Sequence, residues 1–221
     1  MTTMTTTITD TLRLLAWLSP AFPTGGFAYS HGLEWAVENG DIKDGPTLQS
    51  WIEDIIRHGA GRTDATLLRH AHRAAADPKI LAQITELARA TSPSRERLAE
   101  TIGQGNAFRR AATSWNPPDQ DGDIPYPVAV GALAGKHNIP EDTACAAALQ
   151  TFAANLISAA VRLVPLGQST GLTVLAALEP TIAEIAMETT DATLEDLGTA
   201  TFRADLAAMH HETQYTRLFR S

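Results

Sequence analysis

One stretch of the sequence has the spacing of a catalytic serine. Residues 167–171 read Gly-Gln-Ser-Thr-Gly and satisfy the G-x-S-x-G pattern, in which a strained turn exposes a nucleophile, here Ser169. Asp205 and a histidine, His210 or His211, follow in the Ser…Asp…His order of that hydrolase fold. Such a turn needs a preceding β-strand, whereas an alanine-rich helical stretch precedes Gly167. The favoured interpretation is a corner between two helices, and a serine hydrolase using Ser169 is the alternative.

Metal binding near the C-terminus is a second chemical possibility. His210, His211 and Glu212 are consecutive, and adjacent side chains on a helix point ~100° apart. The His-x₃-His or His-x₃-Glu spacing that would place two metal ligands on one helical face is absent. His70 and His72 lie two apart, on opposed faces. His210 and His211 are therefore only weak metal candidates. The chain has no P-loop, no G-x-G-x-x-G and no H-E-x-x-H, and we expect no cofactor.

The last residues combine aromatic, aliphatic and arginine side chains. Tyr215, Leu218 and Phe219 alternate with Arg217 and Arg220. Tyrosine and arginine are frequent anchors of protein–protein contacts, and an ordinary terminus is polar and frayed. The composition leaves two interpretations open: the tail packs onto its own domain, or it inserts into another chain.

A loop over residues 19–27 is the other candidate surface. It contains two prolines, the adjacent glycines Gly25 and Gly26, and two phenylalanines, Phe22 and Phe27. Glycine permits a positive φ or a close backbone approach. The rings either form a partner-binding surface or fill the core beneath a tight turn, and the sequence does not separate these two interpretations.

Composition narrows the class of protein. The 221 residues carry a formal net charge of −8, which argues against nucleic acid and anionic membranes as partners. Cys145 is the only cysteine, so no disulfide framework forms within one chain. Residues 1–9 lack the pattern of a signal peptide, and no run approaches the ~18 apolar residues of a membrane helix. The expected location is the cytoplasm.

Helical periodicity dominates the chain. Leu48, Trp51, Ile52, Ile55 and Ile56 recur at i, i+3, i+4, i+7 and i+8, and similar stripes follow. Residues 141–163 are apolar nearly all round, which predicts a helix buried on most sides. The fold class is therefore all-α: a single-domain bundle of about ten helices around one central helix over about 141–163, without a sheet.

Several boundaries can be predicted within this bundle. We expect a disordered tract over residues 1–10, an all-α domain over 11–214 and a separate tail over 215–221. Ser30 is predicted to cap a helix over 31–39, Asp64 to cap a later helix, and Pro180 to begin a new segment. Gly103 and Gly105 lie inside a predicted helix, where glycine is costly unless another helix crosses closely.

Three separated stretches resemble one family, the UreF-type urease accessory proteins. Residues 14–42, LLAWLSPAFPTGGFAYSHGLEWAVENGDI, resemble the family's opening helix, its S-P-x-x-P-x-G-G-[FY] loop and S-x-G-L-E. Residues 158–171, SAAVRLVPLGQSTG, are similar to its A-x-R-L-x-P-L-G-Q-T-x-G corner, and residues 210–221, HHETQYTRLFRS, to its H-E-x-Q-x-x-R-L-F-x-S tail. Departures are small: Ser169 stands where threonine is common, His31 where glutamine is common, and Phe22 where leucine is frequent.

The resemblance implies a homodimeric all-α scaffold without catalytic activity. Such proteins bridge a UreD/UreH-type accessory protein and the UreG GTPase, act on the urease apoprotein through that complex, and help insert nickel into urease. A direct nickel-binding chaperone using His210, His211 and Glu212 is the alternative within this role.

The resemblance also implies which residues bind partners. It places the tail on the UreD/UreH-type protein, so deleting residues 215–221 should abolish binding while leaving the melting curve nearly unchanged. Carried onto this sequence, the partner-binding candidates are Pro20, Phe22, Pro23, Gly25, Gly26, Phe27, Ser30, Glu34, Arg162, Pro165, Gly167, Gln168, His211, Glu212, Gln214, Tyr215, Arg217, Leu218, Phe219 and Arg220.

Overall fold

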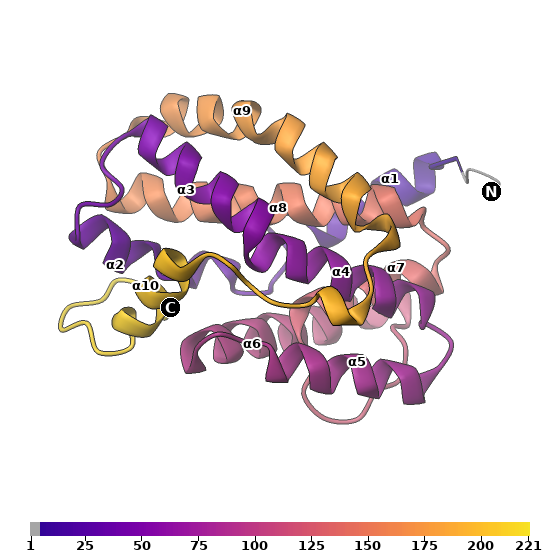
Figure 1. Cartoon of the computed structure of the whole chain (residues 1–221). Coiled ribbons are helices and arrows are strands. Elements are labelled where there is room, and N and C mark those ends of the chain that lie inside the picture. Colours follow the sequence, from indigo (N-terminus) through magenta and orange to yellow (C-terminus); the bar gives the residue numbers. More distant parts are fainter. Residues whose placement is uncertain (1–4) are drawn as a thin grey trace.

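Every regular element in the described part of the chain is helical. The computed structural model describes residues 5–221 (Figure 1), and no β-strand occurs among them, so the all-α prediction is confirmed. The α-helices are α1 (Ile8–Trp17), α2 (Leu33–Glu38), α3 (Gly45–His58), α4 (Ala60–Arg73), α5 (Pro78–Ala90), α6 (Arg95–Ala111), α7 (Tyr126–Lys136), α8 (Glu141–Leu163), α9 (Gly167–Glu188) and α10 (Phe202–His211). Short 3-10 turns are η1 (Gly26–Ala28), η2 (Ala112–Trp115), η3 (Thr189–Asp191) and η4 (Leu194–Asp196).

The first helix begins inside the tract that we expected to be disordered. Thr7 caps α1: its hydroxyl accepts from the Asp10 N–H, and the Asp10 carboxylate accepts from the Thr7 N–H. This reciprocal pair satisfies donors that a helix start leaves free. The expectation is therefore wrong from Ile8 onward, and residues 1–4 lie outside the described part of the chain.

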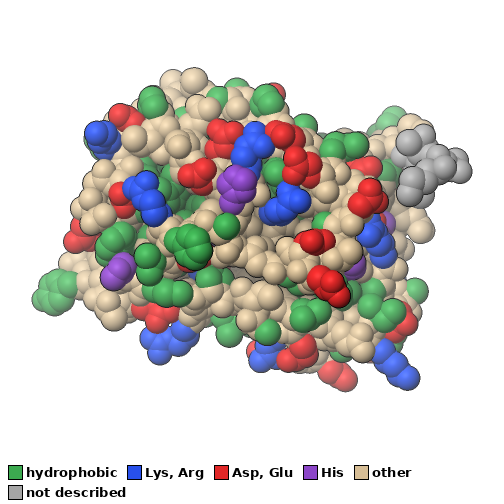
Figure 2. Space-filling model, in the orientation of Figure 1, with side chains coloured by type: hydrophobic (Ala, Val, Ile, Leu, Met, Phe, Trp, Pro, Cys, Tyr) green, Lys and Arg blue, Asp and Glu red, His purple; other side chains and the backbone are tan. Residues whose placement is uncertain are grey.

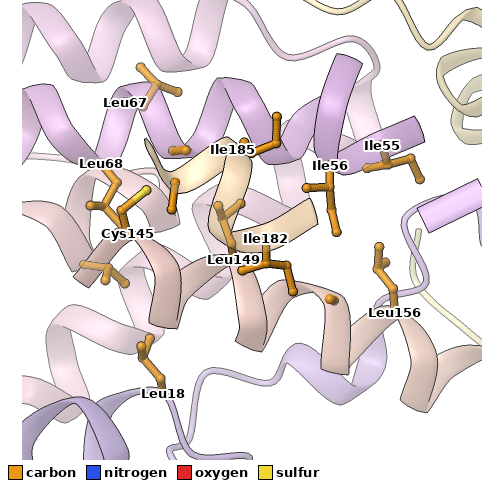
Figure 3. Close-up of a cluster of buried hydrophobic side chains, with 14 of the residues drawn as sticks. Leu18, Ile55, Ile56, Leu67, Leu68, Cys145, Leu149, Leu156, Ile182 and Ile185 are labelled. Atoms are coloured by element: carbon orange, nitrogen blue, oxygen red, sulfur yellow. The ribbon is translucent and has the colours of Figure 1, made fainter. Parts of the chain in front are cut away.

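The core forms where four long helices meet. α3, α8 and α9 run alongside one another, and α4 passes between them and α7. Figure 3 shows the apolar side chains that these helices contribute at the centre. α8 has the predicted bounds and packs against α2, α3, α4, α7 and α9, while α4 shares its central position. The labelled core residues are Leu18, Ile55, Ile56, Leu67, Leu68, Cys145, Leu149, Leu156, Ile182 and Ile185.

Glycine allows the close crossing that the sequence anticipated in α6. A Cβ atom on Gly105 would run into the carbonyl oxygen of Ile124 and would lie 2.8 Å from the N atom of Tyr126, at the start of α7. Only a residue without a side chain permits that approach. The predicted close crossing is therefore confirmed at Gly105, at the start of α7, whereas a Cβ atom on Gly103 would meet the side chain of Tyr29 and no helix.

Three predicted helix boundaries are wrong. α2 begins at Leu33 because His31 and Gly32 both take positive φ, 60° and 76°, which a right-handed helix excludes. α4 begins at Ala60, so Asp64 lies within it and caps nothing. α9 continues through Pro180, whose side of the helix is exposed, so the carbonyl group that loses its partner can be solvated.

α8 and α9 are also long and apolar enough to cross a membrane by length and composition, contrary to the sequence expectation. Both pack against each other and against α3 and α4 in the bundle. The buried core helix of a soluble protein can have the same length and composition, so these two properties are weak support for a membrane span.

Candidate functional site

The three sequence stretches that resembled one family meet at one end of the bundle. The loop before α2, the last turn of α8 and the tail after α10 are joined by hydrogen bonds and a cation–π contact. In Figure 1 the C-terminus lies beside α10, close to α2 and α6. Segments almost two hundred residues apart in sequence therefore form one local structure.

The two phenylalanines of the loop have opposite environments. Phe22 packs inward, with its ring centroid 5.3 Å from that of Phe108 and 6.1 Å from that of Trp115. Gly25 takes a positive φ of 77° and starts the turn η1. Phe27, within this turn, is 74% exposed. Phe22 thus fills the core beneath the turn, as one interpretation of the loop predicted, whereas Phe27 is exposed, as the partner-binding interpretation predicted.

The connection into α2 is shaped by α10. A Cβ atom on Gly32 would lie 2.6 Å from the backbone N of Ala208, so α10 crosses directly over this glycine. Its φ of 76° independently favours glycine. α10 consequently packs on α2, and the ring of His210 stacks on that of Trp35 at 4.6 Å.

Glu34 of α2 holds the tail through its backbone. Its carboxylate accepts hydrogen bonds from the N–H groups of Leu218 and Phe219, at 2.6 and 2.9 Å. Hydrogen bonds to an ionised carboxylate are roughly twice as strong as neutral ones. Glu34 is itself buried, and its carboxylate is directed at the backbone of the tail.

The end of the tail is fixed from the loop side. The Ser30 N–H donates to the Ser221 carbonyl oxygen at 2.7 Å, and the Ser30 hydroxyl donates to the same oxygen. The Arg220 N–H donates to the Ala28 carbonyl oxygen at 2.9 Å. The Ser221 hydroxyl donates to Glu100 of α6 at 2.5 Å. Ser30 therefore fastens the tail, and its hydroxyl also accepts from the Glu34 N–H at 3.3 Å in the first turn of α2, which is the capping contact predicted for it.

Arg162 at the end of α8 joins the loop to the tail. Its guanidinium lies 4.3 Å from the centroid of the Phe219 ring, and its Nη2 donates to the Phe27 carbonyl oxygen at 2.7 Å. Phe219 is only 5% exposed. This aromatic anchor of the tail is therefore buried in its own chain, as the self-packing interpretation requires.

His211 lies at the centre of the charged part of the site. It is fully buried, with Nδ1 2.6 Å from Glu96 and Nε2 3.2 Å from Glu34. The guanidinium of Arg217 also contacts Glu96, at 2.6 Å. Both nitrogens of His211 are thus engaged by carboxylates.

The neighbouring polar residues of the tail also make internal contacts. The Glu212 carboxylate accepts from the Arg95 N–H at 2.9 Å, where it compensates a free donor at the start of α6. The Gln214 side chain donates to Glu38 at 2.5 Å. Among residues 5–221, no group of three histidine, cysteine, aspartate or glutamate side chains is arranged to hold a metal ion.

The serine-hydrolase arrangement does not assemble. Ser169 is exposed in the first turn of α9, and α8 precedes it where the pattern requires a strand. Asp205 instead accepts from the Thr199 hydroxyl, and His211 is held by two glutamates. The corner at Pro165, Gly167 and Gln168 is exposed, with Gly167 at a φ of 71°, as expected for a helix–helix turn.

Some tail side chains do face outward. Tyr215 is fully exposed and Leu218 is 66% exposed, although the backbone of Leu218 is tied to Glu34. Arg217, Arg220, Pro20 and Pro23 are also at the surface. The candidate residues thus divide into a set that fastens the tail and a set that remains available to other molecules.

The sequence reasoning missed an exposed apolar stripe on α10. Phe202, Leu206 and Met209 are exposed at i, i+4 and i+7. Apolar side chains gather on the face in Figure 2 over the region where α10 lies in Figure 1. The sequence contains the signal for this stripe, because apolar residues at helical spacing on one face can be recognised without a structure. The sequence does not show whether such a stripe is buried or exposed.

Fold and site together define an all-α protein in which a C-terminal tail is fastened beside a displayed apolar surface. The family model described as UreF matches residues 42–179, which include α3 to α8 and the first part of α9. Relatives named "Urease accessory protein UreF" extend the similarity to the loop and tail. The one from Bradyrhizobium sp. is 50% identical over 95% of this chain and 91% of its own. Those from Cereibacter sphaeroides and Methylorubrum populi are 52% and 48% identical, over 95% and 96% of this chain and 98% and 99% of their own. The chain belongs to the UreF family.

Proposed function

We propose that this protein is a urease accessory scaffold that binds a UreD/UreH-type partner through the outward side of its fastened tail. Membership of the UreF family, and relatives whose name contains "urease accessory protein", support a role in urease maturation. One structural observation carries the partner surface: Phe27, Tyr215 and Leu218 are exposed next to a backbone that is already held in place. Exposed apolar groups on a rigid backbone bind at a low entropic cost.

The partner surface consists of side chains, and the fastening network supports it. Glu34, Ser30, Arg162 and His211 contact the tail from inside. In this proposal they position Tyr215 and Leu218 without touching the partner. Each therefore affects binding through the conformation of the tail.

The wider assembly follows from the family resemblance. The scaffold forms a homodimer, recruits the UreG-type GTPase and reaches the urease apoprotein through the complex, where nickel is inserted. A dimer with two-fold symmetry would present two equivalent GTPase sites. The protein performs no bond-making chemistry of its own in this role. The exposed corner around Pro165 and Gln168 is a candidate contact in this assembly.

Co-purification tests the proposal. The full chain is co-expressed with a tagged UreD/UreH-type protein and UreG, as wild type and as the double variant Tyr215→Ala, Leu218→Ala. Met187→Ala is the matched control, because Met187 is 65% exposed near the end of α9. We expect wild type and control to co-purify and the double variant to be lost. Retention of the double variant at wild-type level would refute the assigned surface, and absence of any complex with wild type would refute the scaffold role.

A further inference from the structure

A cavity lies between α4, α6, α7 and α8, away from the tail surface. The centres of water-sized molecules can occupy about 60 Å³ of it. By the same measure one water molecule needs ~10–15 Å³, so the cavity has room for several waters or for a small organic molecule. Gly26 and Tyr29 of the loop also line it, and the cavity therefore extends from the core to the loop.

Most of the cavity wall is apolar. Leu68 of α4, Val130 of α7 and Leu149, Phe152 and Leu156 of α8 contribute to it. Figure 3 shows Leu68, Leu149 and Leu156 within the apolar cluster. A wall of this kind favours a short hydrocarbon body and stays dry when no polar group is near.

One side of the cavity carries an unpaired carboxylate. Asp64 of α4 lines it and makes no hydrogen bond or ion pair with any residue of the described range 5–221. Burial raises the pKa of Asp64 to about 7, against the opposing effect of Arg97. Asp64 is half-buried, and it lines both this cavity and a smaller one of about 30 Å³.

Next to this acceptor lies a buried donor without a partner. Arg97 of α6 lines the same two cavities and is 8% exposed, and its Nε has no hydrogen-bond partner among the described residues. The guanidinium is paired with Glu100 through Nη1. Burial opposes the charge of Glu100, yet Arg97 and His31 outweigh it and hold the pKa of that carboxyl well below its usual range. The charge of Arg97 is therefore satisfied, whereas its Nε–H is not.

The unpaired groups limit what the cavity can bind. A buried polar group without a partner costs free energy that a ligand recovers by completing the bond. A carboxylate ligand would meet the like charges of Asp64 and Glu100. An ammonium ligand would have to give up its hydration on entering a buried site, which costs more free energy than the entry of a neutral head. A neutral amide-type head instead offers an N–H to Asp64 and a C=O to Arg97 Nε.

We propose that this cavity binds a small uncharged molecule with an amide-type head and a short apolar body, the head between Asp64 and Arg97 and the body against Leu149 and Phe152. This binding activity goes beyond the scaffold role and does not depend on it. It is a property of the folded chain alone, so it can be measured without any accessory protein.

Titration of the isotope-labelled full chain by NMR tests the site, with butyramide as the probe. We expect saturable shifts confined to amides of the cavity-lining parts of α4, α6, α7 and α8. Butyrate and butylammonium have the same chain length and should bind at least tenfold more weakly. Equal affinity for the three probes, or no saturable shift with butyramide, would overturn the proposal.

Two variants separate the two halves of the site. Ala148→Leu fills part of the cavity from α8 and should abolish butyramide binding. Asp64→Leu removes the acceptor while keeping the number of heavy atoms in the side chain, and should weaken binding at least tenfold. The melting temperature and the NMR spectrum of each variant show whether it folds. If Ala148→Leu does not fold, the affinity of Asp64→Leu for butyramide tests the site on its own. Unchanged affinity in a folded variant contradicts the assigned site.

Discussion

Replacing Phe219 with alanine should destabilise the whole domain, although Phe219 lies two residues from the C-terminus. Its ring is 5% exposed and lies beneath the Arg162 guanidinium at 4.3 Å. Truncating a buried phenylalanine costs ~3–5 kcal/mol. For a chain of this size, 1 kcal/mol shifts the melting temperature by ~2–4 °C. We therefore expect a decrease of roughly 6–20 °C.

The neighbouring residue provides a matched control. Leu218 is 66% exposed, and only its backbone N–H contacts Glu34, so Leu218→Ala should change the free energy of unfolding by no more than ~0.5 kcal/mol. Thermal melts followed by circular dichroism, with urea unfolding as a second measure, compare the two variants. If Phe219→Ala melts like wild type and Leu218→Ala, the tail is not part of the cooperative fold.

The same reasoning replaces an expectation from the sequence. Deletion of residues 215–221 removes the buried Phe219 ring and the hydrogen bonds to Glu34, Ser30 and Ala28. The truncated chain should therefore melt earlier than wild type. Loss of partner binding in that truncation could not by itself be assigned to lost contacts with the partner.

Three further perturbations test the interior. His211→Ala removes a fully buried ring that contacts Glu34 and Glu96 and should cost ~1–3 kcal/mol in urea unfolding, because part of the hydrogen-bonding capacity of both carboxylates is left unused; His210→Ala, exposed and stacked on Trp35, should cost less. The pKa of Asp64 is raised to about 7 in the native state, from ~3.9 in the unfolded chain. Between these pH values the native state holds a proton that the unfolded state has released, so the free energy of unfolding decreases as the pH rises towards 7. Wild type should lose about 2 kcal/mol relative to Asp64→Asn between pH 5.5 and 8, and a constant difference would contradict this. Gly105→Ala places a methyl group against the Ile124 carbonyl and should cost about 2 kcal/mol; a wild-type melting curve would show that α6 and α7 separate easily.

The sequence predicted the helices well because their signal is local. The stripe from Leu48 to Ile56 and the apolar stretch over 141–163 determine α3 and α8, and a period of 3.6 residues needs no knowledge of the partner helix. Predicted helix boundaries were wrong where tertiary packing sets the end of a helix, as at Gly32, where α10 crosses. The boundary predicted at Pro180 was wrong for the opposite reason: α9 is exposed there, so solvent can satisfy the carbonyl group that loses its partner and the helix continues.

The site was predictable as a set of residues and not as an arrangement. The tail composition marked Leu218 and Phe219 equally, yet one side chain points outward and the other is buried. The bond from Glu34 to the Phe219 N–H joins residues 185 positions apart, and no local propensity reports such a pair. Asp64 had the signature of a cap, and only the start of α4 at Ala60 places it on the cavity.

The most direct test of the scaffold account is the dissociation constant of the full chain for a purified UreD/UreH-type partner. It is measured for wild type, for Tyr215→Ala with Leu218→Ala, and for Met187→Ala, after each variant has been shown to melt like wild type. The account predicts that the double variant binds at least tenfold more weakly and that Met187→Ala binds like wild type. Equal dissociation constants for all three proteins would contradict it.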